Sequence, residues 1–299
     1  MKFRSDLTTE KQNPHSESID LKSTEEILQI INSDDKTVAH AVKKAIPQIS
    51  ETISICVSAI KNGNRIIYVG AGTSGRLGVL DASEIPPTFS APPDWFTGII
   101  AGGDAALRKS VEGAEDIPNN GIQDLKEAKI TRGDIIIGIS TSGAAIYVQS
   151  ALEYAQKVGA KTCYISCNPE PFYRVHADST IKVETGSEII TGSTRMKAGT
   201  ATKMILNMIS TTTMIKLGKV YSNLMVDLMA VNEKLMDRGT RIISQLTNTD
   251  YEIAHQKLIE AGKSVKKAII MIKKDCTSDQ AELMLEKAKG FLGRVLKES

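Results

Sequence analysis

The sequence lacks any long hydrophobic run. No segment reaches the roughly 18 uninterrupted apolar residues that a membrane-spanning helix needs. The first twenty residues, MKFRSDLTTEKQNPHSESID, have no apolar core of the kind found in signal peptides. We therefore expect a cytoplasmic protein that does not bind membranes.

An excess of charge of one sign is also missing. The 299-residue chain has 37 Lys and Arg against 35 Asp and Glu, a formal net charge of +2, with the two signs interspersed. A nucleic-acid-binding surface is usually marked by a basic cluster. We therefore expect no nucleic-acid partner.

The sequence contains no recognisable set of metal ligands. Its four cysteines (Cys56, Cys163, Cys167 and Cys276) do not follow the spacing of a zinc site, and its four histidines lie in unrelated contexts. Cys163 and Cys167 lie in and just after an apolar run, where free thiols behave as small hydrophobic groups. We expect a reduced protein without a metal or another cofactor.

Between residues 65 and 217, short apolar runs alternate with helical patterns. This alternation is typical of an α/β fold in which helices cover both faces of a parallel, Rossmann-like sheet. The expected strands are 66–69, 96–100, 134–139, 162–166 and 179–183. The expected helices are 105–115, 122–128, 147–158 and 196–217.

The flanking regions are predicted to be helical, apart from a polar terminus. Residues 1–22 read as a frayed tail, and an apolar stripe predicts a helix over 34–61 that Pro47 kinks. A further helix with a methionine-rich face (Met225, Met229, Met236) is expected over 222–245, followed by three short helices over 251–296. The predicted domains are an N-terminal segment with helices (1–50), a domain built on the parallel sheet (51–246) and a small helical bundle (247–299).

The first expected strand leads into the glycine-rich segment Gly70-Ala71-Gly72-Thr73-Ser74-Gly75. Its backbone N–H groups near Gly72, its Thr73 and Ser74 hydroxyls and the start of a helix together suit an anion. The pattern G-x-G-x-x-G also occurs in dinucleotide-binding folds, which need an acid at the end of the second strand. The first acid there is Asp104, which is too late, so a phosphomonoester is favoured over a dinucleotide.

The second hydroxyl-rich segment, Gly138-Ile139-Ser140-Thr141-Ser142-Gly143, follows another expected strand. Ser140 and Ser142 supply donors beside a helix N-terminus. Because ligands in parallel sheets sit beyond the carboxyl ends of the strands, both segments are expected at one edge. Together they predict a site that holds a phosphosugar by its phosphate.

Two glutamates and one basic segment complete the candidate residues. Glu84 precedes Pro86 and Pro87, which predict the end of its helix, and Glu115 follows 31 residues later. Such a pair can divide acid and base roles, although spacing alone favours a solvated acid at a helix end for each. In GSTRMKAGT, Ser193 or Thr194 can cap a helix, while Arg195 and Lys197 suit an anion or a solvated surface. The residues gathered there as possible ligands are Ser193, Arg195 and Lys197.

Four segments together resemble one family. TTEKQNPHSESID, GAGTSGRLGVLDASEIPPTF, AGGDAALRKSVEGAEDI and GSTRMKAGTATK are similar to the N-acetylmuramic acid 6-phosphate (MurNAc 6-phosphate) etherases. The resemblance covers nearly the whole chain. It implies a sugar isomerase (SIS) fold, a UBA-like helical C-terminus and a cytoplasmic homodimer. The implied reaction cleaves the D-lactyl ether with water, giving N-acetylglucosamine 6-phosphate (GlcNAc 6-phosphate) and D-lactate during peptidoglycan recycling.

The resemblance also implies roles for the two glutamates. Glu84 matches the proton donor of the family and Glu115 its second active-site glutamate. We expect Glu115 to remove the C2 proton of the open-chain sugar and Glu84 to protonate the departing lactyl oxygen, without a cofactor.

One segment departs from the family. The usual Ser-Gly-Arg-Thr-Pro-Tyr is Ser142-Gly143-Ala144-Ala145-Ile146-Tyr147 here, which removes a cation and a hydroxyl near the expected anion site. Two alternatives therefore stay open: a non-catalytic phosphosugar-binding regulator resembling the glucokinase regulatory protein, and an SIS-type aldose–ketose isomerase.

Overall fold

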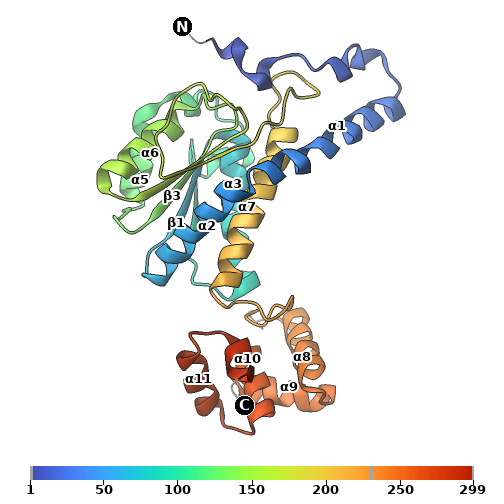
Figure 1. Cartoon of the computed structure of the whole chain (residues 1–299), viewed down its shortest axis with the longest axis vertical. Coiled ribbons are helices and arrows are strands. Elements are labelled where there is room, and N and C mark those ends of the chain that lie inside the picture. The colour runs from blue at the N-terminus through green and yellow to red at the C-terminus, as the bar shows by residue number, and fades with distance from the viewer. Residues whose placement is uncertain (1–2, 229–231, 298–299) are drawn as a thin grey trace. The chain divides into compact units, whose positions relative to one another are not determined.

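The computed structural model describes residues 3–228 and 232–297 and divides them into two compact units. The first unit contains residues up to 83 and 94–210, and the second contains 84–93 and 211 onward. We describe each unit by itself (Figure 1). The domain limits predicted at residues 50/51 and 246/247 stay predictions.

The first unit is built on a five-stranded parallel sheet, as the alternating pattern predicts. The strand order is β2-β1-β3-β4-β5. All five strands were predicted to within about one residue at each end. Their bounds are β1 Ile66–Gly70, β2 Phe96–Ile100, β3 Ile135–Ile139, β4 Lys161–Ser166 and β5 Ser179–Lys182.

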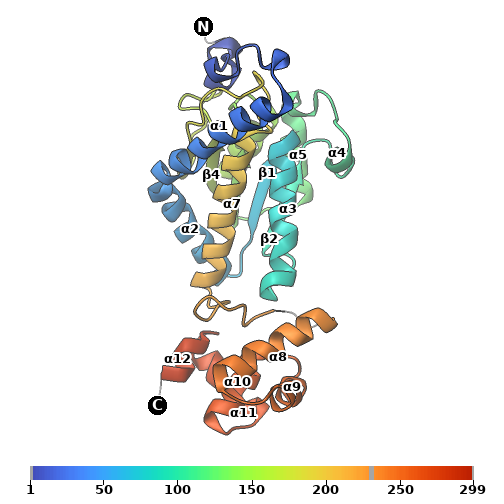
Figure 2. The same ribbon diagram turned by 90° about the vertical axis from the view of Figure 1, so that its right-hand side faces the viewer.

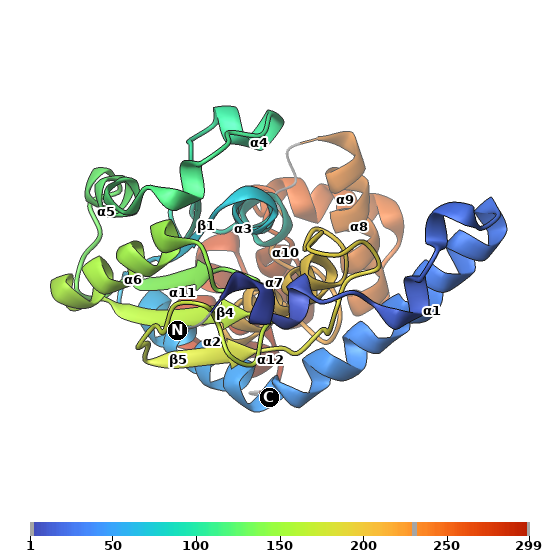
Figure 3. The ribbon, with the colours of Figure 1, turned by 90° about the horizontal axis from the view of Figure 1, so that it is seen from above.

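Helices cover both faces of this sheet. On one face α6 packs against β1, β3 and β4 and is itself covered by α5, and on the other face α2 packs against β1, β3 and β5 (Figure 3). β1 and β3 are buried along their whole length, as expected for strands covered on both sides. The helices that begin in this unit are α1 Thr24–Lys44, α2 Ile46–Lys61, α3 Gly72–Phe89, α4 Ala105–Arg108, α5 Pro118–Glu127, α6 Ile146–Val158 and α7 Lys197–Lys216.

Two glycines allow α3 to start against β1. A Cβ atom on Gly70 would lie 2.7 Å from the Gly75 nitrogen, and one on Gly75 would lie 2.6 Å from Cγ1 of Ile100. No side chain fits at either position, so the first turn of α3 lies directly on the strand. Further along, α3 and α7 run beside each other, joined by an ion pair of 3.1 Å between Asp81 and Lys203 (Figure 2).

Three predicted helices in this part of the chain were wrong in extent. The helix expected over 34–61 is two helices that break at Ala45, because Pro47 lacks an N–H and its ring clashes with the preceding turn. The helix expected over 105–115 ends at Arg108, and the left-handed Gly113 (φ 73°) separates it from a short 3-10 turn. Conversely, α3 continues through Pro86 and Pro87 to Phe89, whose side chain is buried.

The prediction of a frayed tail was also wrong. Residues 4–21 form four short 3-10 turns, and Leu7, Thr9 and Asn13 are buried. We call residues 3–16 the N-terminal strap. It runs beside the loop that contains residues 186–196, drawn in dark blue and dark yellow in Figure 1.

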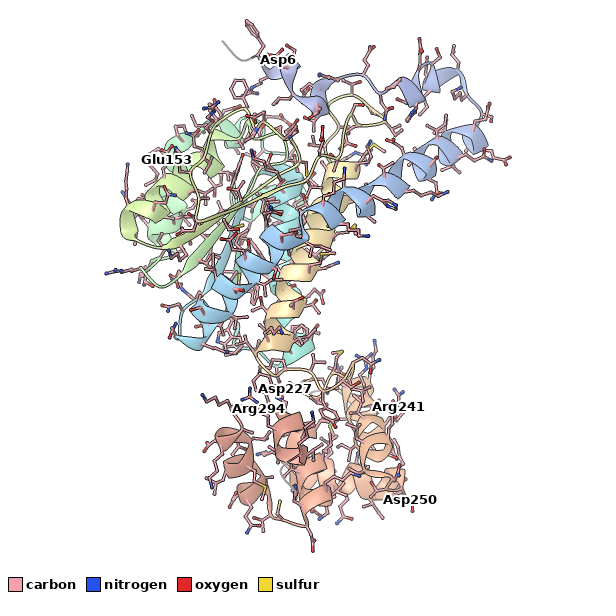
Figure 4. The ribbon with its side chains drawn as sticks, viewed as in Figure 1. Asp6, Glu153, Asp227, Arg241, Asp250 and Arg294 are labelled. Atoms are coloured by element: carbon pink, nitrogen blue, oxygen red, sulfur yellow. The ribbon has the colours of Figure 1, made fainter. Side chains whose placement is uncertain are left out.

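The second unit is a helical bundle with its own apolar core, to which Ile243, Leu258, Ile269 and Leu292 belong. At its edge, the Asp227 carboxylate pairs with Lys219 at 3.2 Å and Lys266 at 2.7 Å; Asp227 is labelled in Figure 4. Its helices are α8 Glu233–Thr247, α9 Tyr251–Glu260, α10 Val265–Lys274, α11 Ser278–Lys287 and α12 Leu292–Lys297.

Two predictions in this unit need correction. The helix expected over 222–245 begins only at Glu233, where the Asn232 side chain accepts the N–H of Leu235 and caps it. Three helices were expected after residue 250, but four form, because Gly290 (φ 78°) separates α12 from α11. Met225 and Met236 pack against the core as expected, whereas Met229 lies outside the described residues. No helix in 3–228 or 232–297 has the length and apolar character needed to span a membrane.

The buried Asp134 is expected to stabilise the first unit. Its carboxylate pairs with Arg65 at 2.8 Å and accepts the N–H groups of Arg65 and Thr131. Burial works to raise the pKa of Asp134, but these hydrogen bonds hold it below its usual range. Asp134→Asn should therefore lower the free energy of unfolding by about 3 kcal/mol, measured by urea denaturation at neutral pH.

The pH dependence gives a second readout for the same variant. Because the folded pKa is lowered, this stabilisation exists above the unfolded pKa of about 4 and disappears as pH falls through the folded value. The difference between wild type and Asp134→Asn should shrink below about pH 4. The matched control is the exposed Asp94→Asn, and equal stability of the two variants would contradict the role of Asp134.

Candidate active site

A cavity of about 230 Å³ lies at the carboxyl edge of the sheet, within the first unit. The chain order reverses between β1 and β3, and doubly wound sheets bind ligands at this switch point. The segments that follow β1 and β3 both line the cavity. Its lining consists of Arg4, Leu7, Glu10, Ala71, Gly72, Thr73, Ser74, Glu115, Ile139, Ser140, Thr141, Ser142, Ala144, Ala145, Gly192 and Thr194.

The first segment brings Gly72, Thr73 and Ser74 to the cavity at the start of α3. Gly72 has a φ of 54°, a conformation that glycine adopts readily. The unpaired N–H groups and the positive end of the dipole of an 18-residue helix therefore face the cavity. This arrangement suits a phosphate or another anion.

The second segment brings Ser140 and Ser142 to the same cavity. The Ser142 hydroxyl accepts the N–H of Ala144 at 3.2 Å, and Ser140 accepts that of Ala145 at 3.4 Å. The Ser142 hydroxyl still has its hydrogen to donate, whereas the Ser140 hydroxyl also forms a hydrogen bond with Tyr164. The two predicted hydroxyl-rich segments are thus brought together, with five hydroxyl side chains between them counting Thr73, Ser74 and Thr141.

Glu115 is the predicted glutamate that lines the cavity. It also lines a neighbouring cavity of about 160 Å³, so it lies between the two. Burial raises the pKa of the Glu115 carboxyl, and the negative charges of Asp116 and Glu112 raise it further against the opposing effect of Arg4. A carboxylate with a raised pKa is a stronger base, which suits proton abstraction.

Glu84 does not line this cavity. Its side chain is exposed on α3, twelve residues beyond Gly72. With a rise of 1.5 Å per residue, about 18 Å of helix separates the two positions. The structure of one chain therefore does not bring the two predicted glutamates together.

The basic segment before α7 differs from the prediction. Lys197 is buried, and its ammonium group lies 2.7 Å from the carboxylate of Asp34, which also accepts a hydrogen bond from Asn13. The carboxylate of Glu188 accepts the N–H groups of Lys197 and Ala198, each at 2.9 Å. A protein carboxylate thus already occupies the N-terminus of α7.

These contacts change the interpretation of the three predicted ligands in this segment. Neither Ser193 nor Arg195 lines the cavity, and Arg195 is exposed to solvent. Neither Ser193 nor Thr194 makes the cap of α7 that was expected of one of them, since Glu188 fills that place. Instead, Gly192 and Thr194 of this segment reach the cavity.

Sequence reasoning missed the contribution of the N-terminal strap, which brings Arg4, Leu7 and Glu10 to the cavity. Its position depends on contacts with residues far along the chain, which no local pattern reveals. The one available signal was TTEKQN, which the resemblance includes. Within 3–228 and 232–297, no group of three or more His, Cys, Asp or Glu side chains is placed to hold a metal ion.

The parallel sheet and the family models that match it place this chain in the SIS class. The model of the glucokinase regulatory protein N-terminal SIS domain matches residues 48–156, and that of the SIS domain matches residues 116–212. Among solved structures, a phosphoheptose isomerase from Francisella tularensis is 21% identical with a TM-score of 0.46. That comparison covers 62% of this chain and 98% of the isomerase.

Two curated relatives identify the family. N-acetylmuramic acid 6-phosphate etherase 1 of Bacillus licheniformis is 50% identical over 97% of this chain and 95% of its own length. The N-acetylmuramic acid 6-phosphate etherase of Oceanobacillus iheyensis is 50% identical over 96% of this chain and 97% of its own length. The chain belongs to the N-acetylmuramic acid 6-phosphate etherase family.

The contacts of Lys197 predict a structural role for this residue. Lys197→Met would leave the buried Asp34 carboxylate without its cation, at a cost of about 3–5 kcal/mol in the free energy of unfolding. Asp34→Asn combined with Lys197→Met should lose less, because no buried charge is then uncompensated. Urea denaturation measures both, with the exposed Lys36→Met as matched control. If Lys197→Met were as stable as the control but bound phosphosugars more weakly, Lys197 would be a ligand instead.

Proposed function

We propose that this chain is a MurNAc 6-phosphate etherase that converts its substrate and water into GlcNAc 6-phosphate and D-lactate. The observation that carries the proposal is the cavity at the β1/β3 switch point, where hydroxyl-rich segments and a helix N-terminus face Glu115. Family membership, with about 50% identity over nearly the whole chain, supports the same reaction. The regulator and the isomerase are not favoured by these relatives.

The phosphate is proposed to lie against the first turn of α3. Gly72, Thr73 and Ser74 provide N–H and hydroxyl donors, and Ser140 and Ser142 provide donors from the opposite side. Hydrogen bonds to a phosphate are charge-assisted and strong, so this end of the sugar would be fixed. The reacting carbons would then lie toward Glu115.

Elimination followed by addition of water accounts for the reaction. The Glu115 carboxylate removes the C2 proton of the open-chain sugar, and the electron pair of the C–H bond forms an enolate with the C1 aldehyde. The C3–O bond then breaks, Glu84 protonates the departing lactyl oxygen, and a double bond forms between C2 and C3. Water adds at C3 while Glu84 accepts its proton, and Glu115 returns a proton to C2.

The second carboxylate is proposed to come from another copy of the chain. Glu84 lies outside the cavity of its own chain, and Leu80, one turn earlier on the same helix face, is 46% exposed. A two-fold pair of chains would allow Glu84 of each to reach the site of the other. We therefore propose a homodimer with shared sites, which acts in the cytoplasm, where MurNAc 6-phosphate would be recycled.

The mechanism separates the effects of the two glutamates. In D2O, Glu84→Gln should still exchange the C2 proton of MurNAc 6-phosphate while releasing lactate at least about 100-fold more slowly. Glu115→Gln should lose both activities, because the enolate no longer forms. Mass spectrometry measures the exchange and an enzymatic assay measures D-lactate. The matched control is Glu127→Gln, an exposed glutamate of α5. Exchange lost in Glu84→Gln but retained in Glu115→Gln would reverse the assigned roles.

Shared sites are tested by mixing the two inactive variants. If Glu115 and Glu84 of one site come from different chains, hybrid dimers contain one intact site. A randomised equal mixture of Glu84→Gln and Glu115→Gln should then regain about one quarter of wild-type lactate release. A mixture that exchanges subunits, shown by mass spectrometry of tagged chains, yet stays inactive would show that each site belongs to one chain.

A further inference from the structure

The N-terminal strap is a fixed wall of the cavity. Leu7 and Thr9 are 2% and 0% exposed. The Thr9 carbonyl accepts the N–H of Gly192 at 3.0 Å, and the Asn168 amide group bonds both to the Thr9 hydroxyl at 3.2 Å and to the Thr141 carbonyl at 3.0 Å. These buried contacts join the strap to the second hydroxyl-rich segment. The strap backbone around Thr9 is therefore held in place beside the cavity.

Arg4 is the single cation among the described residues that line the cavity. The other charged lining residues are Glu10 and Glu115. The Arg4 guanidinium lies 3.4 Å from the Asp116 carboxylate and 5.8 Å from the centre of the Phe172 ring. Only one of its nitrogens makes the Asp116 contact. A guanidinium has five N–H donors, so others remain for a ligand.

The second hydroxyl-rich segment contributes no cation. Ala144 and Ala145 line the cavity there, and neither side chain carries a charge or a hydrogen-bonding group. A substrate with a phosphate and a carboxylate brings up to three negative charges into a cavity that already contains two glutamates. Without a cation, the carboxylate of such a substrate would be desolvated and unpaired, which is strongly unfavourable.

We propose that Arg4 binds the lactyl carboxylate of the substrate and takes the place of the cation that the second segment lacks. The proposal rests on the proposed function. Arg4 lies near Glu115, since its guanidinium pairs with Asp116, the next residue in the chain, and Arg4 and Glu115 line the same cavity. Glu115 is assigned to C2, and the lactyl group is on the adjacent C3, whereas the phosphate is on C6 at the other end of the sugar. Arg4 is therefore on the side of the lactyl group.

The test compares two ligands that differ in the lactyl group. Calorimetry would measure the binding of MurNAc 6-phosphate and GlcNAc 6-phosphate to Glu115→Gln protein, in which turnover is stopped. Adding Arg4→Ala should weaken binding of MurNAc 6-phosphate at least about tenfold, the usual effect of one lost charge-assisted bond, and leave GlcNAc 6-phosphate within about twofold. Arg4→Lys should be intermediate, because the planar fork is lost but the charge remains.

Controls separate binding from folding and from the reaction itself. Lys11→Ala removes an exposed strap cation that does not line the cavity and should leave both affinities unchanged. In the Arg4→Ala background, Ala144→Arg restores a cation to the cavity and should recover affinity for MurNAc 6-phosphate. Circular dichroism melting checks that each variant is folded.

Two results would overturn the assignment. If Arg4→Ala behaved like Lys11→Ala, Arg4 would not be a ligand. If both sugars lost affinity equally, Arg4 would serve the phosphate, which they share. If the proposed function itself were wrong, the wild-type protein would release no D-lactate. Calorimetry would still measure the affinities for the two sugars, so the two failures can be distinguished.

Discussion

The structure depends on the order of its parallel strands. Because the chain starts at β1, crosses to β2 on one side and then to β3 on the other, the segments that follow β1 and β3 lie together at the carboxyl edge. Gly70 and Gly75 let α3 begin directly against β1, so its unpaired N–H groups face the gap between these segments. The phosphate site that we propose in this cavity follows from the strand order and from these few small or hydroxyl-bearing residues.

Buried polar contacts complete the cavity. The Asp34–Lys197 ion pair and the two N–H groups that Glu188 accepts fix the start of α7, and Asn13 joins the strap to the same carboxylate as Lys197. Buried charges are tolerated in such places only when they are paired and hydrogen-bonded. The two cations before α7 therefore do not line the cavity, since Lys197 is paired with Asp34 and Arg195 faces solvent, whereas Arg4 on the strap does line it.

The sequence predicted what local chemistry determines. The five strands were recognisable from short β-branched runs, and the hydroxyl-rich segments from glycine and serine at strand ends. The structural role of Lys197 could not be predicted, because its partner Asp34 lies in another helix. The strap was predicted to be frayed because its contacts are distant in sequence: Thr8 and its partner Asn168 are 160 residues apart. The predicted helix ends were wrong where a proline or a left-handed glycine interrupts a helix that the apolar pattern would continue, as at Pro47 and Gly113.

The most direct test of this account is the release of D-lactate from MurNAc 6-phosphate by the wild-type protein. We predict stoichiometric D-lactate and GlcNAc 6-phosphate without an added metal or redox cofactor. Tight binding of MurNAc 6-phosphate without lactate would contradict the account and favour a phosphosugar-binding regulator. Conversion of the aldose to a ketose with the ether intact would contradict it equally and favour an isomerase.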